Sequence, residues 1–300
     1  MYHEGVMWQG NFNAVVTPFR QDGSIDEVAF KKNIELLISE GIDGLVVTGC
    51  TGESWALSND ERTRMHRIAV EASSGRVPVI AGTLAMLTDT VVEQSKKAKD
   101  AGADGVMVTP PHFILPSEED ITKHYSCISQ EADVPILVYN NPRRVGVDIP
   151  PALLEKLCEI ENVVAVKQSS GNFTDIVETV RLCGDKIRVF AGHCAARGFP
   201  CVAMGTHGFV SSGETQILGK KAIDLYRLSA AGDNHAARSL QYRLVELSHA
   251  MHGLGTFPSA LKAAMNLVGR PGGYPRDPIQ PLREEDQKRL QSNLHSLGVL

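Results

Sequence analysis

Val163-Val164-Ala165-Val166-Lys167 is the stretch of sequence that decides the fold. Its apolar, mostly β-branched residues predict a buried parallel strand. Lys167 closes the run, and Gln168-Ser169-Ser170-Gly171 leads from it into a helical pattern. A buried strand has little use for a cation at its end. An enzyme that forms an imine with a carbonyl substrate does need such a lysine, which must be desolvated, have a lowered pKa and point into a pocket.

Runs of the same kind recur along the chain and alternate with helical patterns. The expected strands are Asn13–Thr17, Gly44–Thr48, Pro78–Ala81, Gly105–Thr109, Pro135–Tyr139, Val163–Lys167, Ile187–Ala191 and Gly208–Ser211. The helices expected among them include Asp26–Glu40, Asn59–Ser73, Asp89–Ala101, Glu118–Glu131 and Ala152–Glu159, with Asp26 and Asn59 as N-caps. Eight β/α units of about 25–30 residues predict a (β/α)8 TIM barrel. An open doubly wound sheet is the competing architecture, but no Gly-x-Gly-x-x-Gly turn follows the first strand.

The β pattern ends after Ser211. Four further helices are expected at Leu218–Ala231, Ala236–His252, Phe257–Val268 and Glu284–Leu297. The first of them would complete the barrel, which we expect to span residues 1–231. The other three would form a C-terminal helical extension over residues 232–300, with Gly269–Pro281 as a loop inside it.

Composition and charge narrow the functional class. The 300 residues are 43% hydrophobic and carry a net charge of −5 with scattered lysines and arginines. A membrane span needs about 18 consecutive apolar residues, and no stretch of the sequence comes close to that length. The scattered charges also do not indicate a basic surface that would bind nucleic acid. Met1-Tyr2-His3-Glu4-Gly5 lacks the start of a signal peptide. We therefore expect a protein that binds neither membrane nor nucleic acid.

The cysteines and histidines are scattered. Cys50, Cys127, Cys158, Cys183, Cys194 and Cys201 show no CxxC spacing, which favours a reducing cytoplasm over a disulfide scaffold. Two groups could be imagined as metal ligands, namely His193 and Cys194 with Cys201 and His207, and His249 with His252. Neither has a zinc spacing signature, so no metal is expected.

Chemically useful side chains cluster where the expected strands end, which is where a barrel carries its active site. Thr48-Gly49-Cys50-Thr51-Gly52-Glu53-Ser54 offers backbone N–H groups and a hydroxyl to a carboxylate or phosphate, or is simply a tight turn. Tyr139 could move protons beside Lys167 or be a buried aromatic residue at the barrel rim. Arg144 could bind a carboxylate with its two-pronged guanidinium or be a solvated loop charge.

Together these motifs resemble the dihydrodipicolinate synthase / N-acetylneuraminate lyase family. The resemblance is carried by Gly49-Cys50-Thr51-Gly52-Glu53, Tyr139-Asn140-x-Pro142 and Val166-Lys167, and it spans nearly the whole chain. It implies a class I aldolase on a TIM barrel and a cytoplasmic homotetramer built as a dimer of dimers. It also implies that no cofactor is needed, because the protonated imine on the lysine itself withdraws the electrons.

The resemblance also implies roles for individual residues. Lys167 would form the imine with pyruvate or another 2-oxo acid, and Tyr139 would transfer protons. Cys50, Thr51 and the adjoining Gly52 would form the loop that holds the pyruvyl carboxylate. Gly192 and Val210 would line the pyruvyl pocket, and Arg144 would receive the carboxylate of a second substrate.

Two positions depart from the synthase pattern. Cys50 stands where synthases have a second threonine, and a thiol is a weaker hydrogen-bond partner than a hydroxyl. His112 stands where they have a tyrosine that a neighbouring subunit donates, so we expect it at the substrate site of its own or a neighbouring chain. Imine chemistry is expected to survive both changes. The lysine-pathway condensation is less favoured, and Arg144 points to a compact substrate with a distal carboxylate.

The leading hypothesis is therefore a Schiff-base-forming lyase or aldolase acting on pyruvate or a short 2-oxo acid with a distal carboxylate. The alternatives are a genuine dihydrodipicolinate synthase (4-hydroxy-tetrahydrodipicolinate synthase), and a hydroxy-pyrroline-carboxylate deaminase or sugar-acid dehydratase that uses the same enamine. A fourth possibility, from another functional class, is a non-catalytic 2-oxo-acid sensor that kept the barrel and lost turnover.

Overall fold

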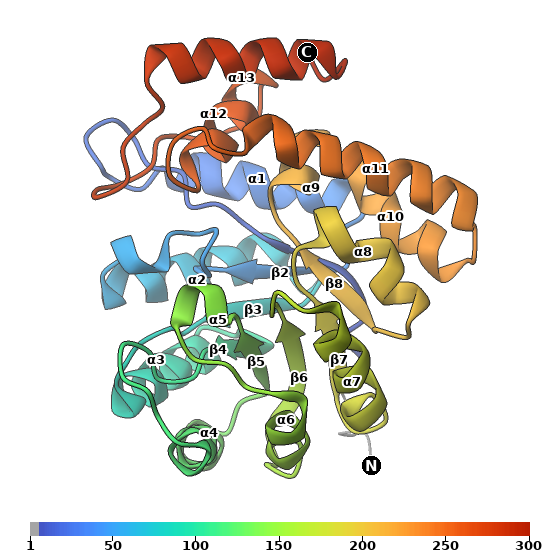
Figure 1. Cartoon of the computed structure of the whole chain (residues 1–300). Helices are drawn as coiled ribbons and strands as arrows, with labels where there is room; N and C mark the ends of the chain where they lie inside the picture. The colour runs from blue at the N-terminus through green and yellow to red at the C-terminus, as the bar shows by residue number, and fades with distance from the viewer. Residues whose placement is uncertain (1–5) are drawn as a thin grey trace.

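A closed barrel of eight parallel strands forms the centre of the molecule (Figure 1). The computed structural model describes residues 6–300, so the expectation about a signal peptide at Met1–Gly5 lies outside the described residues. The strands are β1 (Gly10–Ala14), β2 (Gly44–Val47), β3 (Val79–Gly82), β4 (Gly105–Val108), β5 (Ile136–Asn140), β6 (Val163–Gln168), β7 (Arg188–Ala191) and β8 (Gly208–Ser211). Each strand pairs with the next, and β8 closes on β1. The TIM-barrel prediction is confirmed.

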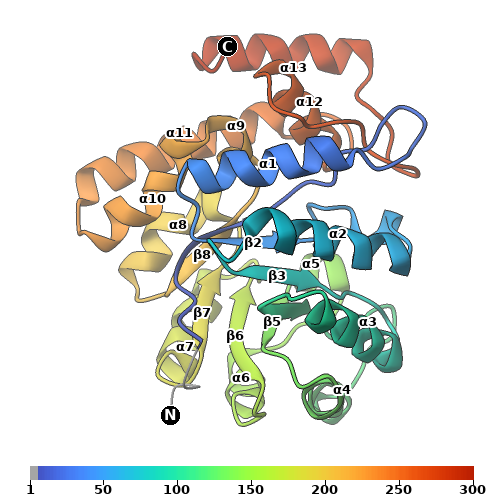
Figure 2. The same cartoon turned by 180° about the vertical axis from the view of Figure 1, so that it is seen from behind.

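Helices follow the strands and cover the outside of the barrel (Figures 1 and 2). They are α1 (Glu27–Ser39), α2 (Asn59–Ser73), α3 (Thr88–Asp100), α4 (Glu118–Ala132), α5 (Pro142–Val145), α6 (Pro151–Leu157), α7 (Phe173–Cys183), α8 (Cys194–Ala203), α9 (Gly213–Leu218), α10 (Lys220–Ala230), α11 (Asn234–Met251), α12 (Ser259–Leu267) and α13 (Glu284–Ser296), with the short 3-10 helix η1 (Ser54–Ala56). Asp26 caps α1 as predicted, and its side chain accepts a hydrogen bond from the backbone N–H of Ala29.

Two local predictions were wrong, and one short helix was missed. The first strand ends at Ala14 instead of Thr17, because the N–H of Val16 leaves the sheet and donates to the side-chain oxygen of Gln216. Helix α2 is capped by Ser58, which forms a capping box with Glu61, and not by Asn59. The helix expected at 218–231 is α10, but the short helix α9 before it was not expected; Gly219, whose φ is +58°, separates the two helices.

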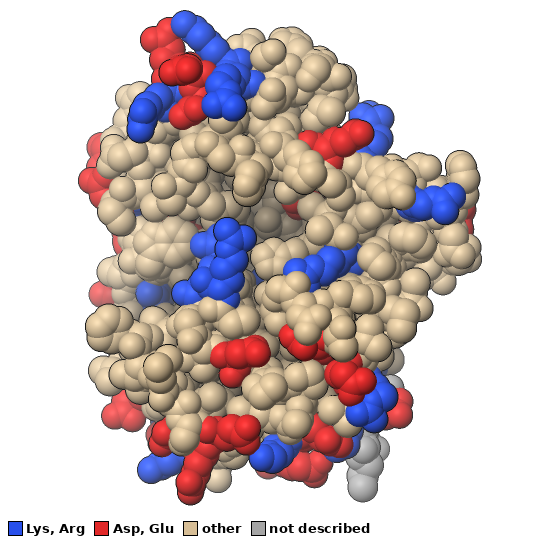
Figure 3. Space-filling view, in the orientation of Figure 1, with Lys and Arg blue, Asp and Glu red and all other residues tan. Residues whose placement is uncertain are grey.

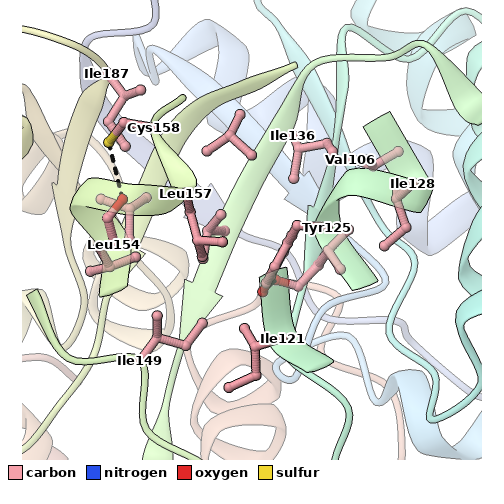
Figure 4. Packing of buried hydrophobic residues seen from close by; sticks show 14 of the residues in the cluster. Val106, Ile121, Tyr125, Ile128, Ile136, Ile149, Leu154, Leu157, Cys158 and Ile187 are labelled. Carbon is pink, nitrogen blue, oxygen red and sulfur yellow. Dashed lines mark hydrogen bonds between the residues drawn. The ribbon is translucent and has the colours of Figure 1, made fainter. Parts of the chain in front are cut away.

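Two apolar cores hold the barrel together. One fills its interior, where the rings of Phe12 and Phe190 lie 4.9 Å apart between centroids and pack with Tyr139 and Val210. The other packs helices onto the outer face of the strands, and Figure 4 shows its part around Tyr125, whose hydroxyl donates to the carbonyl of Val108 at 3.1 Å. Side chains that alternate between these cores explain why the strands are apolar on both faces.

Helices α11 and α12 pack against α9, and α13 packs against both of them along one flank of the barrel (Figures 1 and 2). Leu247, Leu261 and Leu290 join them in one apolar cluster, which also contains Val16 just beyond β1. The extension is thus packed directly against the barrel, and the exact division at residue 231 stays a prediction. Within residues 6–300, no helix is both long enough and apolar enough to cross a membrane.

Candidate active site

Lys167 and Tyr139 lie side by side inside the mouth of the barrel. They are register partners on the adjacent strands β6 and β5. The Nζ atom of Lys167 lies 4.3 Å from the centroid of the Tyr139 ring, and the two residues are 7% and 5% exposed. None of the ion pairs formed among residues 6–300 involves Lys167. A buried amine without a carboxylate partner is available to an anionic carbonyl compound that enters the mouth.

The phenol of Tyr139 is oriented by the next loop. Its oxygen accepts a hydrogen bond of 2.7 Å from the side-chain amide of Asn141. Asn140 fixes the backbone at this point, because its amide group donates to Gln168 at the end of β6 and its oxygen accepts from the N–H of Ile149. The Tyr139 hydroxyl therefore keeps its own proton free for donation while its oxygen is already held in place.

The loop after β2 presents unused donors. Within residues 6–300, no group accepts a hydrogen bond from the backbone N–H groups of Cys50 and Thr51 or from the Thr51 hydroxyl. Gly52 permits the tight turn, since a Cβ there would lie 3.1 Å from the backbone of both Thr48 and Val15. Burial raises the pKa of the Cys50 thiol, although Arg144 and Lys167 nearby act to lower it. The loop can thus bind an anion with neutral donors.

Two buried side chains hold this loop from behind. Thr48, whose φ of +52° starts the turn, lies 2.7 Å from Nε2 of His66 on α2. Burial lowers the pKa of His66 to about 3, so the ring is neutral near pH 7. At the other end of the turn, Glu53 forms a fully buried ion pair with Lys262 of α12. The C-terminal extension therefore helps to set the shape of the β2 loop.

Gly192 and Val210 lie at the ends of β7 and β8. Both are buried, and Val210 packs in the same interior cluster as Tyr139. Gly192 has no room for a side chain, because a Cβ would come within 1.9 Å of the Ser169 hydroxyl oxygen. The structure brings these two predicted residues to the mouth of the barrel, where they form part of its wall.

The outer part of the mouth is positively charged. Figure 3 shows lysine and arginine side chains over α5 and over α8 around a hollow in the middle of this face. Arg144 of α5 is exposed, and its Cζ lies 4.9 Å from the ring centroid of Phe257. His193 before α8 faces the same charges. Desolvation of the ring, and next the charge of Lys167, lower the pKa of His193 to about 4. A neutral imidazole beside arginines favours anionic ligands.

His112 is not joined to this arrangement. It is half-buried in the loop after β4, where burial lowers its pKa. Among residues 6–300, no hydrogen bond or ion pair connects His112 to Lys167 or Tyr139. Its position at the substrate site remains a prediction. Nor do three or more His, Cys, Asp or Glu side chains gather as a possible metal site within that part of the chain.

Three residues of this region were missed from the sequence as parts of the site: Asn141, His193 and Lys262. Asn141 is two residues after the predicted Tyr139, so its proximity in the sequence was a usable signal. His193 was considered only as a metal ligand. Lys262 looks like an ordinary polar residue of a helix, and only the packing of the extension against the barrel brings it to the β2 loop.

Comparisons with known proteins agree with this geometry. The model of the dihydrodipicolinate synthetase family matches residues 7–297. A 4-hydroxy-tetrahydrodipicolinate synthase of Syntrophobacter fumaroxidans is 36% identical over 295 residues, which cover 98% of this chain and 100% of that protein. The dihydrodipicolinate synthase structure from Aquifex aeolicus has a TM-score of 0.91 at 32% identity, covering 97% of this chain and 99% of that one. A prophage protein of E. coli K12 from the same family, solved in complex with pyruvate, has a TM-score of 0.93 at 27% identity, covering 98% and 100%.

Proposed function

The chain belongs to the dihydrodipicolinate synthetase family and is a Schiff-base-forming lyase of the aldolase type, and we propose that Lys167 forms the imine with pyruvate or a similar short 2-oxo acid. One observation carries the proposal. Lys167 is an unpaired amine at the end of a barrel strand, 7% exposed, with a phenol at its side. A relative also supports pyruvate as the substrate, because its structure was solved in complex with pyruvate.

The substrate carboxylate would bind first. The unused N–H groups of Cys50 and Thr51, with the Thr51 hydroxyl, would take its oxygens. This anchoring would place the 2-oxo carbon against the Nζ atom of Lys167. The neutral amine would then add to the carbonyl to give a carbinolamine, and loss of water would give the iminium ion.

Tyr139 would transfer the protons of these steps. Its hydroxyl would donate a proton to the departing carbinolamine oxygen, and the resulting phenolate would later take a proton from C3 of the iminium ion to give the enamine. The hydrogen bond from Asn141 would stabilise the phenolate oxygen between the two steps. Because the protonated imine withdraws electrons, the C3 proton becomes acidic without a metal or an organic cofactor.

Arg144 would receive a second carboxylate. Its guanidinium lies over Phe257 at the mouth and is exposed. Stacking on an aromatic ring leaves the N–H groups at the guanidinium edge free for a bidentate contact. The enamine would thus meet an electrophile whose distal carboxylate is held at the rim.

Deuterium exchange tests the proposal without knowledge of the second substrate. Pyruvate incubated with the enzyme in D2O should lose its methyl proton signal, because each enamine is reprotonated by solvent. The Lys167→Arg variant keeps a long basic side chain and loses the nucleophile, so exchange should fall to the rate without enzyme. Exchange in the variant equal to that in the wild type would refute the role of Lys167.

Genuine 4-hydroxy-tetrahydrodipicolinate synthase activity is the second candidate. The names of relatives that are 34–37% identical over nearly the whole chain favour it. Cys50 and His112 oppose it, since a thiol and an imidazole replace two hydroxyl groups of the synthase proton relay. A coupled assay with pyruvate and aspartate semialdehyde decides between the two. Turnover comparable to that of a typical enzyme, about 10 per second, would establish the synthase.

We also propose a homotetramer, a dimer of dimers, that works in a reducing cytoplasm. The loops after β2, β3 and β4 lie at the same end of adjacent strands, and each exposes large apolar side chains. These are Trp55, Met86, Leu87, Phe113, Ile114 and Leu115, of which Phe113 is 91% exposed. A second copy of the chain would cover them. Light scattering should give the mass of four chains, and a monomer at micromolar concentration would contradict the proposal.

The proposed reducing cytoplasm is supported by the cysteines. All six are free thiols, as a reducing compartment would keep them.

A further inference from the structure

Asn141 carries an amide group that the local fold does not use. It is the N-cap residue of α5, a position where asparagine ordinarily caps the helix, but its side chain makes no capping hydrogen bond. The side chain is instead buried, with 2% of the residue exposed. Its neighbour Asn140 shows the contrast, because both ends of that amide bond to protein groups, among them the Gln168 side chain and the N–H of Ile149. The burial of Asn141 therefore serves something other than the backbone around it.

One end of the Asn141 amide has a partner and the other has none. Its Nδ2 atom donates to the hydroxyl oxygen of Tyr139 at 2.7 Å. Its Oδ1 atom is closed off from bulk solvent, and no group among residues 6–300 donates a hydrogen bond to it. A buried amide oxygen without a donor costs about 1–3 kcal/mol. The chain accepts this cost directly beside the phenol of the proposed site, so we look to the reaction for the missing donor.

The position of Oδ1 limits what this donor is. Oδ1 belongs to the same planar group as Nδ2, so it too lies close to the phenol oxygen of Tyr139. The Tyr139 ring lies beside Lys167, with 4.3 Å between Nζ and the ring centroid. The substrate atoms that approach Oδ1 are therefore those that exchange protons with the phenol. Ionised pyruvate has no O–H or N–H group, and the first donor to form is the C2 hydroxyl of the carbinolamine, which then leaves as water.

Water satisfies this position in either orientation of the amide. Reversing the amide would leave Nδ2 without a partner in place of Oδ1, and water both donates and accepts. A cationic donor is disfavoured, because the iminium ion on Lys167 already places a positive charge beside the phenol. A large donor is excluded, since Oδ1 is enclosed by the protein. The group that completes Asn141 is thus small, neutral and a donor.

We propose that Asn141 is a catalytic residue, which holds the water molecule of the imine reaction between its Oδ1 atom and the Tyr139 hydroxyl. The inference rests on the proposed imine chemistry of Lys167. In the forward step, Tyr139 gives its proton to the C2 hydroxyl of the carbinolamine while Oδ1 accepts a hydrogen bond from that hydroxyl. The C2–O bond breaks with its electron pair on oxygen, the lone pair of Nζ completes the C=N bond, and water stays bound to Oδ1. In hydrolysis the same water adds to C2 and gives a proton back to the Tyr139 oxygen.

A label chase measures this step without a second substrate. The protein is saturated with isotopically heavy pyruvate and mixed with an excess of unlabelled pyruvate, and borohydride stops the reaction at successive times. The ratio of heavy to light adduct on Lys167, measured by mass spectrometry, gives the rate of imine hydrolysis. Asn141→Leu keeps the approximate size of the side chain and removes its hydrogen bonds, so the chase should slow about 10- to 100-fold. The half-saturating concentration of pyruvate should stay nearly unchanged, because imine formation and hydrolysis share one transition state and slow together.

A double-mutant cycle separates this role from the orientation of Tyr139, which Asn141→Leu also disturbs. In Tyr139→Phe the phenol is already absent, and adding Asn141→Leu should still slow the chase by about 10-fold. A role limited to orienting Tyr139 predicts no further slowing in this background, and that result would overturn the proposal. Equal chase rates in the wild type and in Asn141→Leu would overturn it as well.

Two more variants complete the test. Asn141→Ala replaces Asn141→Leu if the latter does not fold, and it should slow the chase less, because the space it leaves admits a water molecule. Asn162→Leu is a matched control at the opposite end of β6, where the amide donates to the carbonyl of Ser129 at 3.0 Å. Its chase rate should equal that of the wild type, and slowing as large as in Asn141→Leu would contradict a specific role for Asn141. Absence of any adduct on Lys167 in the wild type would refute the proposed function instead.

Discussion

Replacing Lys262 with methionine removes the cation of a fully buried ion pair that links the extension to the carboxylate loop. Lys262 is 0% exposed, pairs with Glu53 and donates to the carbonyls of Thr17 at 2.6 Å and Tyr274 at 2.7 Å. Burial lowers its pKa to about 8, so it is mostly charged at pH 7. Without it, Glu53 remains as an uncompensated charge in the interior.

The expected cost is about 3–5 kcal/mol in the free energy of unfolding, the usual result of removing one partner of a buried pair. This is a large part of the about 5–15 kcal/mol that stabilises a typical protein. Urea unfolding measures the cost directly. The half-saturating concentration of pyruvate should rise as well, because Glu53 directly follows Gly52 in the loop.

Lys220 provides a matched control. It forms an exposed ion pair with Asp224, which lies four residues further along the same helix. Lys220→Met should cost less than about 0.5 kcal/mol. Adding Glu53→Gln to the Lys262→Met variant should recover part of the loss, since the second change removes the unpaired charge. A cost below about 1 kcal/mol for Lys262→Met would refute the argument that this pair fixes the loop.

Three further predictions concern the site. Tyr139→Phe should lower kcat by about 10²- to 10⁴-fold and slow pyruvate trapping, with little change in the pyruvate concentration that half-saturates trapping at equilibrium; Asn141→Ala should have a smaller effect in the same direction, measured by steady-state kinetics. Gly192→Ala should abolish pyruvate trapping because its Cβ would come within 1.9 Å of the Ser169 hydroxyl oxygen, and Ser169→Gly should partly restore it. His66, with a pKa of about 3 when folded against about 6.5 when unfolded, gives stability that is complete above pH 6.5 and is lost toward pH 3, by about 1.4 kcal/mol per pH unit. Urea unfolding at several pH values should show a flatter acid slope for His66→Gln, and an unchanged slope would contradict this.

The barrel could be predicted because its signal is local. Each strand is a short β-branched run bounded by turn residues, and Lys167 was noticeable as the one charge that ends such a run. Tyr139 ends the preceding strand, so parallel pairing of neighbours placed it beside Lys167. The ends of elements were less accurate, as at Val16, where a side chain from α9 takes over the backbone N–H that a neighbouring strand would bind.

The supporting residues could not be predicted because their partners are distant in the sequence. Lys262 lies in an unremarkable helical pattern, and nothing in that pattern indicates a buried carboxylate at Glu53. His66 has the spacing of a core-facing helical residue, and its contact with Thr48 depends on how α2 packs against β2.

Peptide mapping after borohydride reduction tests the central claim most directly. The protein is incubated with pyruvate, reduced and digested, and the modified residue is located by mass spectrometry. We predict one pyruvate-derived adduct per chain, on Lys167, which forms only when pyruvate and reductant are both present. Absence of an adduct with pyruvate and with longer 2-oxo acids, or an adduct on another lysine, would contradict the assignment of Lys167 as the imine-forming residue.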